Sequence, residues 1–252
     1  MSNMLNRLSM QGVLVEKWFG IRVRALILIN PHNPLGDIYP AQLLKECLEF
    51  AHRYELHVIM DEIYMLSVYG DVTFTSVLSL ESLPDPERTH FMWGFSKDFG
   101  MSGIRVGILY TRNHEIQKAV NQLAVFHSCP GPVQHVLSQF LKDRDWMDNV
   151  FFPTNKKRLK EAQNLLVDGL ADIGVPVLKS SGGLYVWADF RKVCEKLRKW
   201  WGCGSWKCEN YLCMLLHALI PGPEKSFQII CILVQSLIVF FFLLVVLKIT
   251  DI

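Results

Sequence analysis

Short apolar runs alternate with amphipathic stretches along the first half of the chain. The runs ALILIN (25–30), HVIMDEIY (57–64), RTHFMWGFS (88–96) and RVGILYT (105–111) are bounded by turn residues or polar clusters. Runs of this length are typical of strands buried in a parallel sheet. Between the first two lies AQLLKECLEFAHRYEL (41–56), whose apolar residues recur at helical spacing. The pattern therefore begins as strand, helix, strand.

Helical patterns dominate the following region. They occupy HEIQKAVNQLAVFH (114–127), PVQHVLSQFLKD (132–143) and the stretch 146–173, and extended character returns in GVPVLKSSGGLYVWADF (174–190). Strands that alternate with helices predict an α/β domain, with a mostly parallel sheet and helices on both faces. In such a domain the functional side chains gather at the carboxyl ends of the strands.

Composition narrows the class of protein. The chain has 252 residues, 50% of them hydrophobic, which suits one large domain or one domain and a half. The net charge of +2, with both signs mixed along the chain, gives no footprint for nucleic acid. Residues 1–30 lack the pattern of a secretory signal, so we expect a cytoplasmic body.

The C-terminal part differs in character. Five of the seven cysteines follow Val193, which marks 194–226 as a diverged, Cys- and Trp-rich segment. Its C-x₄-C spacing from Cys203 to Cys213 fits no standard zinc pattern, and we predict no metal site. Residues 227–247 form 21 uncharged, mostly apolar positions, a candidate transmembrane helix that would make the protein membrane-associated. The alternative is an apolar C-terminal extension without a membrane role.

Polar side chains follow each predicted strand. Asn33 follows the first strand, Asp61 and Tyr64 end or follow the second, and Lys97 follows the third, with Arg105 eight residues later. Each has an ordinary reading as a turn residue, strand-end acid, core tyrosine or surface lysine. Together they match an aromatic cofactor with a phosphate tail, which needs a carboxylate, hydroxyl or amide donors, an arginine and a nucleophilic amine.

Three motifs give this combination a family resemblance. NPHNPLG (30–36), MDEIY (60–64) and SKDFGMSGIRVG (96–107) resemble the signatures of the class I/II aminotransferases, pyridoxal phosphate enzymes of fold type I. The wording YMLSV (64–68) and LPDPERTH (83–90) is closest to animal 1-aminocyclopropane-1-carboxylate synthase-like proteins. The resemblance covers about residues 20–193 and implies a partial fold type I large domain with an incomplete small α+β domain.

The resemblance also implies a role for each site residue. Lys97 would bind pyridoxal 5'-phosphate covalently and then act as the base that removes the substrate Cα proton. Asp61 would keep the pyridine nitrogen protonated, Asn33 and Tyr64 would bind the phenolic oxygen, and Arg105 would bind the phosphate. The family implies an amino-acid substrate and a homodimer. Transamination and closure of a three-membered ring both stay open.

The sequence departs from the family at several points. Gly94 stands where a phosphate-binding Ser or Thr is common. The family's other phosphate loop and its carboxylate-binding arginine find no counterpart, so the chain resembles an enzyme truncated at both ends. We expect an N-terminal helical segment at 1–24, a cofactor-binding portion at 25–142 and the incomplete small domain at 143–193. Two hypotheses follow: a pyridoxal phosphate enzyme acting on amino acids, or a catalytically inactive relative, membrane-anchored if 227–247 inserts.

Overall fold

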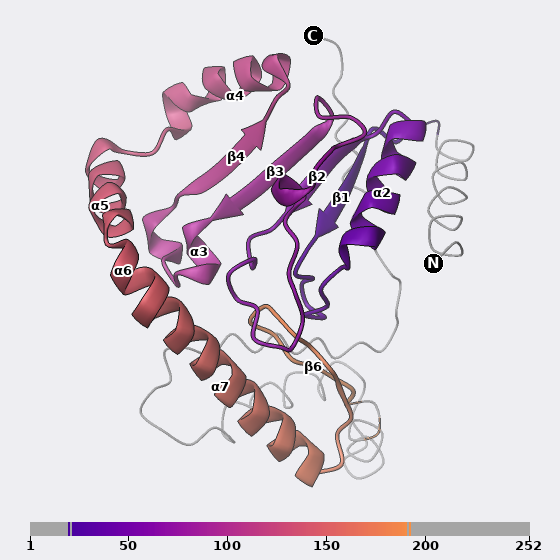
Figure 1. Ribbon diagram of the computed structural model, residues 1–252, viewed down its shortest axis with the longest axis vertical. Coiled ribbons are helices and arrows are strands. Elements are labelled where there is room, and N and C mark those ends of the chain that lie inside the picture. The colour runs from indigo at the N-terminus through magenta and orange to yellow at the C-terminus, as the bar shows by residue number, and fades with distance from the viewer. Residues whose placement is uncertain (1–19, 21, 191, 193–252) are drawn as a thin grey trace, which may run out of the picture.

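A parallel-rich sheet forms the centre of the computed structural model, which describes residues 20, 22–190 and 192 (Figure 1). Its strands are β1 (Ala25–Ile29), β2 (His57–Asp61), β3 (Thr89–Gly94) and β4 (Gly107–Thr111), in the order β1-β2-β3-β4. The first three are parallel and β4 is antiparallel to β3. The prediction of an α/β fold with a mostly parallel sheet is therefore confirmed.

The apolar runs form strands whose side chains are buried against the apolar face of the first helix. Helix α2 (Ala41–Arg53) buries Leu44, Cys47, Leu48, Phe50 and Ala51, which recur at the predicted helical spacing. These side chains, except Phe50, pack with Leu28, Val58, Met60, Val77 and Phe91 in one core cluster. Burial of this cluster from water is the main force that holds α2 on the sheet.

Short helices and one long helix follow the central strands. They are η1 (Val77–Ser79), α3 (Phe95–Asp98), η2 (Ser102–Ile104), α4 (His114–His127), α5 (Gly131–Lys142), α6 (Arg144–Trp146) and α7 (Phe152–Asp172), with a π-helical turn, η3 (Met147–Phe151), before α7. In α4 the Asn113 side chain caps the amino end, accepting hydrogen bonds from Glu115 N and Ile116 N at 3.0 Å each. Helix α7 runs diagonally away from the sheet toward the last strands (Figure 1).

A second, smaller core lies at the end of α7. The strands β5 (Val177–Leu178) and β6 (Trp187–Ala188) pair antiparallel, and Leu170, Val175, Val186, Ala188 and Phe190 are buried together there. This region joins the main sheet through the loop after β1, where the Gly36 carbonyl accepts hydrogen bonds from Ser181 N and Gly182 N. It occupies the place of the predicted small domain at 143–193, although the boundary itself stays a prediction.

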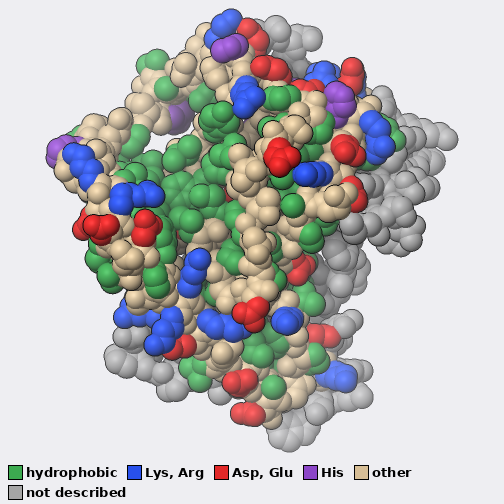
Figure 2. Space-filling model, in the orientation of Figure 1, with side chains coloured by type: hydrophobic (Ala, Val, Ile, Leu, Met, Phe, Trp, Pro, Cys, Tyr) green, Lys and Arg blue, Asp and Glu red, His purple; other side chains and the backbone are tan. Residues whose placement is uncertain are grey.

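The sheet leaves one apolar surface open within the described residues. Ile108, Leu109 and Tyr110 of β4 are 40–47% exposed, and α4 buries none of its residues. Figure 2 shows hydrophobic side chains gathered over this part of the molecule.

Three predicted segments fall wholly or mostly outside the described residues. Of the predicted N-terminal helix at 1–24, residues 22–24 are irregular and nearly all the rest lies outside. The segments 194–226 and 227–247 lie outside entirely. Among the helices that the structure describes, none is both long and apolar enough to cross a membrane.

Candidate functional site

The five predicted site residues all lie at the ends of strands, or in the connections next to them, at one edge of the sheet. β1, β2 and β3 are parallel, so their carboxyl ends meet at that edge, where Asp61 is in register with Ile29 and Met92. β4 runs the other way and begins at Gly107, which pairs with Gly94. The residues just before β4 therefore return to the carboxyl ends of β1–β3.

Asn33 and Tyr64 are in direct contact there. Asn33 Nδ2 donates to the Tyr64 hydroxyl oxygen at 3.3 Å, although the two residues come from the loops after different strands. The same amide nitrogen lies 3.4 Å from the hydroxyl oxygen of Tyr185, and the two tyrosine hydroxyls are hydrogen-bonded to each other. The rings of Tyr64 and Tyr185 meet edge to face with centroids 5.6 Å apart.

Tyr185 is the residue that the sequence motifs did not single out. It is 6% exposed, and it lies between the turn at Gly182–Gly183 and β6. Its available signal was an aromatic residue two positions after a double glycine, in the extended segment that returns to the sheet. Because 121 residues separate Tyr64 from Tyr185, only the folded chain reveals this pair.

Asp61 and Glu62 are adjacent carboxylates with different surroundings. Asp61 is half-buried, its Oδ1 accepts a hydrogen bond from Ile63 N at 3.2 Å, and burial raises its pKa. Glu62 is fully buried, and its Oε1 accepts from Val77 N at 2.7 Å. Burial also raises the pKa of Glu62. Asp61 is therefore the accessible acid of the pair, and Glu62 anchors the segment around Val77.

Lys97 lies in α3, the four-residue helix that follows β3 without a gap. Its side chain is half-buried, and no ion pair engages it among the described residues. The next residue, Asp98, is 2% exposed and accepts three hydrogen bonds from Leu66 N, Ser67 Oγ and Trp93 Nε1. Lys97 thus has no charged partner among the described residues, and the hydrogen bonds of Asp98 hold its helix in place.

Arg105 and Gly94 occupy the predicted phosphate side. Arg105 is exposed, has a left-handed backbone (φ 56°, ψ 44°), and donates from Nη1 to Ser102 O at 3.0 Å. A Cβ at position 94 would lie 3.0 Å from the Val106 carbonyl oxygen. The close approach of β3 and β4 therefore favours glycine here, at the cost of the hydroxyl that the family commonly supplies.

Two cavities in the described part of the chain lie away from the five predicted residues. One of about 430 Å³ is lined by residues that include Val77, Phe91 and Arg112, and another of about 420 Å³ lies between Tyr69 and Lys160. Neither is lined by any of the five predicted residues. These two cavities are therefore separate from the candidate site.

Comparison with known proteins agrees with the motifs. The profile of the family described as aminotransferase class I and II matches residues 5–210. The chain is 50% identical over 184 residues to mouse 1-aminocyclopropane-1-carboxylate synthase-like protein 1, covering 73% of this chain and 36% of that protein. It is also 50% identical over 186 residues to human probable inactive 1-aminocyclopropane-1-carboxylate synthase-like protein 2, covering 73% and 33%. The chain therefore spans about a third of the length of these relatives.

Solved structures show the same fold. The aromatic aminotransferase from Pyrococcus horikoshii superposes with a TM-score of 0.62 at 28% identity, covering 73% of this chain and 50% of that one. An aspartate aminotransferase from Thermus thermophilus, solved with maleate, gives a TM-score of 0.59 at 23% identity, with coverage of 68% and 44%. Motifs, family profile and fold agree, and the chain belongs to the aminotransferase class I and II family.

Proposed function

We propose that this chain binds pyridoxal 5'-phosphate at the carboxyl edge of the sheet, covalently through Lys97, and turns over no amino acid. The observation that supports binding is the Asn33–Tyr64 hydrogen bond, made by residues 31 apart on the edge that also carries Asp61 and Lys97. The family is built around this cofactor, which supplies an electron sink for negative charge at the substrate Cα.

The chemistry of the donors fits the group. The half-buried carboxylate of Asp61 would accept a hydrogen bond from the protonated ring nitrogen, a charge-assisted contact. Asn33 Nδ2 and the Tyr64 hydroxyl are donors side by side, which suits one phenolic oxygen. Lys97 Nζ would bond the aldehyde carbon and, when displaced by an amine, would be free to take a proton.

The phosphate side is the weaker part of the site. Arg105 would make the two-pronged contact for which a guanidinium is suited, after giving up its hydrogen bond to the Ser102 carbonyl. Gly94 provides no hydroxyl, which removes a contact worth about 1–3 kcal/mol. We therefore expect weaker cofactor binding than in a relative with Ser or Thr at this position.

Absorbance spectroscopy of the purified full chain tests this proposal. Addition of pyridoxal 5'-phosphate should produce the visible band of lysine-bound cofactor, and Lys97→Ala should abolish it. Lys118→Ala is the matched control, because Lys118 is an exposed lysine on α4, paired only with Glu115. Equal bands in wild type and Lys97→Ala would show that cofactor reacts with surface lysines instead.

The second candidate is an active enzyme on an amino-acid substrate, assembled as a homodimer. The observation in its favour is Tyr185, which brings a second hydroxyl, from the smaller core, to the Asn33–Tyr64 pair. Mixing the loaded protein with a panel of amino acids separates the two candidates. A band that bleaches with an amino acid, together with release of an oxo acid or a cyclised product, would overturn the proposal of inactivity.

A membrane role for 227–247 belongs to the same proposal. The segment lies outside the described residues, and its 21 uncharged positions are the only support. Pelleting of the full chain with membranes that resists both salt and alkaline carbonate would support an inserted helix. If residues 227–247 are the cause, the protein should stay in the supernatant once they are deleted and should pellet with membranes when they are present.

A further inference from the structure

The residue after Lys97 makes an unusual set of contacts for so short a helix. Asp98 is 2% exposed, and each of its oxygens is used: Oδ1 accepts from Ser67 Oγ at 2.7 Å, and Oδ2 accepts from Leu66 N at 3.1 Å and Trp93 Nε1 at 2.8 Å. The three donors come from two segments, the turn after β2 and the strand β3. One carboxylate therefore connects α3 to both.

The turn after β2 is the segment that carries the other site residues. It runs on from Asp61 through Tyr64 to Ser67, and it is closed by the backbone hydrogen bonds Met65 N to Glu62 O and Ser67 N to Tyr64 O, both 2.9 Å. Asp98 binds this turn two and three residues after Tyr64. The spacing between Lys97 and the Tyr64 hydroxyl thus depends on a carboxylate adjacent to the lysine.

The same turn extends the connection to the smaller core. The Ser67 carbonyl accepts a hydrogen bond from Gly183 N at 2.9 Å, and Val68 forms a β-bridge with Gly182. Tyr185 follows two residues later. Asp98 and Ser67 therefore lie on a continuous hydrogen-bonded path from the Lys97 helix to the segment that carries the Tyr185 hydroxyl.

Aromatic packing holds the other side of α3. The Trp93 ring meets Phe95 and Phe99 edge to face, with centroids 5.0 and 5.9 Å apart, and Phe99 stacks on Phe151 at 5.3 Å. These contacts restrict the helix, but they are not directional in the way that hydrogen bonds are. A helix of four residues has almost no stability of its own, so its orientation depends on such external contacts.

From these contacts we infer that Asp98 is a positioning residue, which sets the orientation of Lys97 relative to the turn that carries Asp61 and Tyr64. This inference rests on the proposed function in one respect, because the orientation of Lys97 matters only if the lysine reacts with a cofactor aldehyde. The hydrogen bonds of Asp98 do not depend on that function. Loss of the carboxylate should leave the strands in place and release α3.

Asparagine is the informative substitution, because it can reproduce the geometry without the charge. In Asp98→Asn the amide oxygen can accept from Leu66 N and Trp93 Nε1, and the amide nitrogen can donate to Ser67 Oγ. Asp98→Ala loses all three contacts. Trp93→Phe keeps an aromatic ring beside Phe95 and loses the Nε1 donor to Asp98. Trp146→Phe is its matched control, because Trp146 belongs to the same aromatic cluster through Phe140 and Phe151 but is not a donor to Asp98.

The assay uses pyridoxal 5'-phosphate as the probe, with borohydride reduction and peptide mass spectrometry to measure the label at each lysine. Because misplacement by about 1 Å can cost about 100-fold in rate, we expect labelling of Lys97 to slow at least about tenfold in Asp98→Ala. We expect Asp98→Asn to stay near wild type, Trp93→Phe to fall between, and Trp146→Phe to match wild type. The label at Lys118 should not change in any variant.

Amide hydrogen exchange on the cofactor-free protein separates this inference from the proposed function. Asp98→Ala should speed exchange at Leu66 N, and at Gly100 N, which is hydrogen-bonded to the Lys97 carbonyl at 3.0 Å. Asp98→Asn should restore protection at both. Absence of Lys97 label in wild type would refute the proposed cofactor binding but not the positioning role of Asp98. The positioning role would be overturned if Asp98→Ala left amide exchange unchanged, or if Asp98→Ala and Asp98→Asn lost the Lys97 label equally. If Asp98→Ala does not fold, the rate of Lys97 labelling in Trp93→Phe is compared with that in Trp146→Phe. Equal rates in these two variants would then overturn the role.

Discussion

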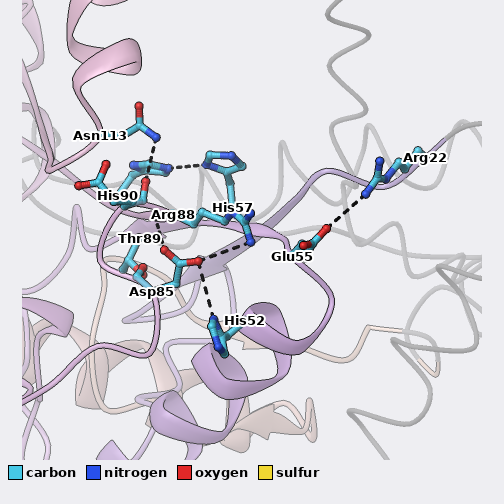
Figure 3. Close-up of polar contacts among 10 residues, drawn as sticks. Arg22, His52, Glu55, His57, Asp85, Arg88, Thr89, His90 and Asn113 are labelled. Carbon is cyan, nitrogen blue, oxygen red and sulfur yellow. Dashed lines mark hydrogen bonds and ion pairs between the residues drawn. The ribbon is translucent and has the colours of Figure 1, made fainter.

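Two histidines at the amino ends of the central strands predict a pH dependence of stability. His57 Nδ1 lies 2.9 Å from His90 Nε2 (Figure 3). On the other side of the ring, His90 Nδ1 lies 2.8 Å from Thr111 Oγ1. His90 is 4% exposed, and burial, with His57 next to it, lowers its pKa to about 4. Burial and the nearby Arg88 also lower the pKa of His57. Both histidines therefore resist protonation in the folded protein.

The sign and size of the effect follow from linkage. In the unfolded chain a histidine has a pKa of 6.5, whereas folded His90 becomes protonated only near pH 4. Between these pH values the unfolded chain therefore binds more protons than the folded protein. The stability that neutral His90 contributes is present above pH 6.5 and is lost as the pH falls toward 4, by about 2 kcal/mol between pH 7 and pH 5. Depression of the His57 pKa adds in the same direction.

Asp98 opposes this loss. Burial raises its pKa from 3.8 to about 6, against the hydrogen bonds from Trp93 and Ser67. Its folded form therefore holds a proton that the unfolded chain has released, and stability rises as the pH falls from 6 toward 3.8. Between pH 7 and pH 5 the gain is about 1 kcal/mol, so these two groups together give a net loss of about 1 kcal/mol.

Urea denaturation at pH 7 and pH 5, followed by far-ultraviolet circular dichroism, separates the two contributions. His90→Gln removes one titrating imidazole, so acidification should destabilise this variant by about 2 kcal/mol less than wild type. Asp98→Asn removes the opposing group, so acidification should destabilise this variant by about 1 kcal/mol more than wild type. His127→Gln, an exposed histidine on α4, should behave as wild type. An acid response of His90→Gln equal to that of wild type would refute the linkage through this pair.

Three further substitutions test the core, the loop after β1 and the site. Leu44→Ala should lower the free energy of unfolding by about 2–5 kcal/mol, because Leu44 is fully buried between α2 and the sheet. Leu165 is exposed on α7, so Leu165→Ala should change this free energy by less than about 0.5 kcal/mol. Urea titration measures both values, and similar values would contradict the assigned core. Gly36→Ala should destabilise by more than about 1 kcal/mol in thermal denaturation, since φ is +69° and a Cβ would lie 2.5 Å from Ser180 Cβ, whereas Gly169→Ala within α7 meets nothing within 4 Å and should be neutral or stabilising. Asp61→Asn should weaken binding of pyridoxal 5'-phosphate about tenfold or more in a spectrophotometric titration, as expected for loss of a charge-assisted hydrogen bond worth about 1.5–3 kcal/mol; an unchanged dissociation constant would remove Asp61 from the ring nitrogen.

Much of the central sheet was predictable because each strand and the first helix carry their own period. The apolar run 25–30 gave β1, and the spacing of Leu44, Cys47 and Leu48 gave the buried face of α2. The direction of β4 was not predicted. The connection 95–106 contains only the short helices α3 and η2, and no helix long enough to cross back over the sheet, so β4 returns antiparallel.

The location of the candidate site residues at one edge was predictable for the same reason. Asn33, Asp61 and Lys97 each end or follow a recognisable strand, and parallel strands end at a common edge. Tyr185 and Asp98 carry no such local signal. Tyr185 comes to the edge through contacts across more than a hundred residues, and Asp98 reads from sequence as one more polar residue in a loop. Their roles follow from burial and hydrogen-bond partners, which exist only after folding.

The hydrogen bonds that order the carboxyl edge of the sheet are made between described residues. The described residues do not cover the exposed apolar side chains of α4. The Gly36 carbonyl holds the segment before Tyr185, and Ser67 connects that segment to Asp98, so each link between the loops closes within residues 22–190. By contrast, Val125 and Phe126 of α4 are 77% and 86% exposed, and the described residues offer them no apolar partner. Replacing these two with polar residues should therefore improve solubility and leave reaction at Lys97 unchanged. Loss of Lys97 reactivity in such a variant would show that the edge depends on whatever packs against α4.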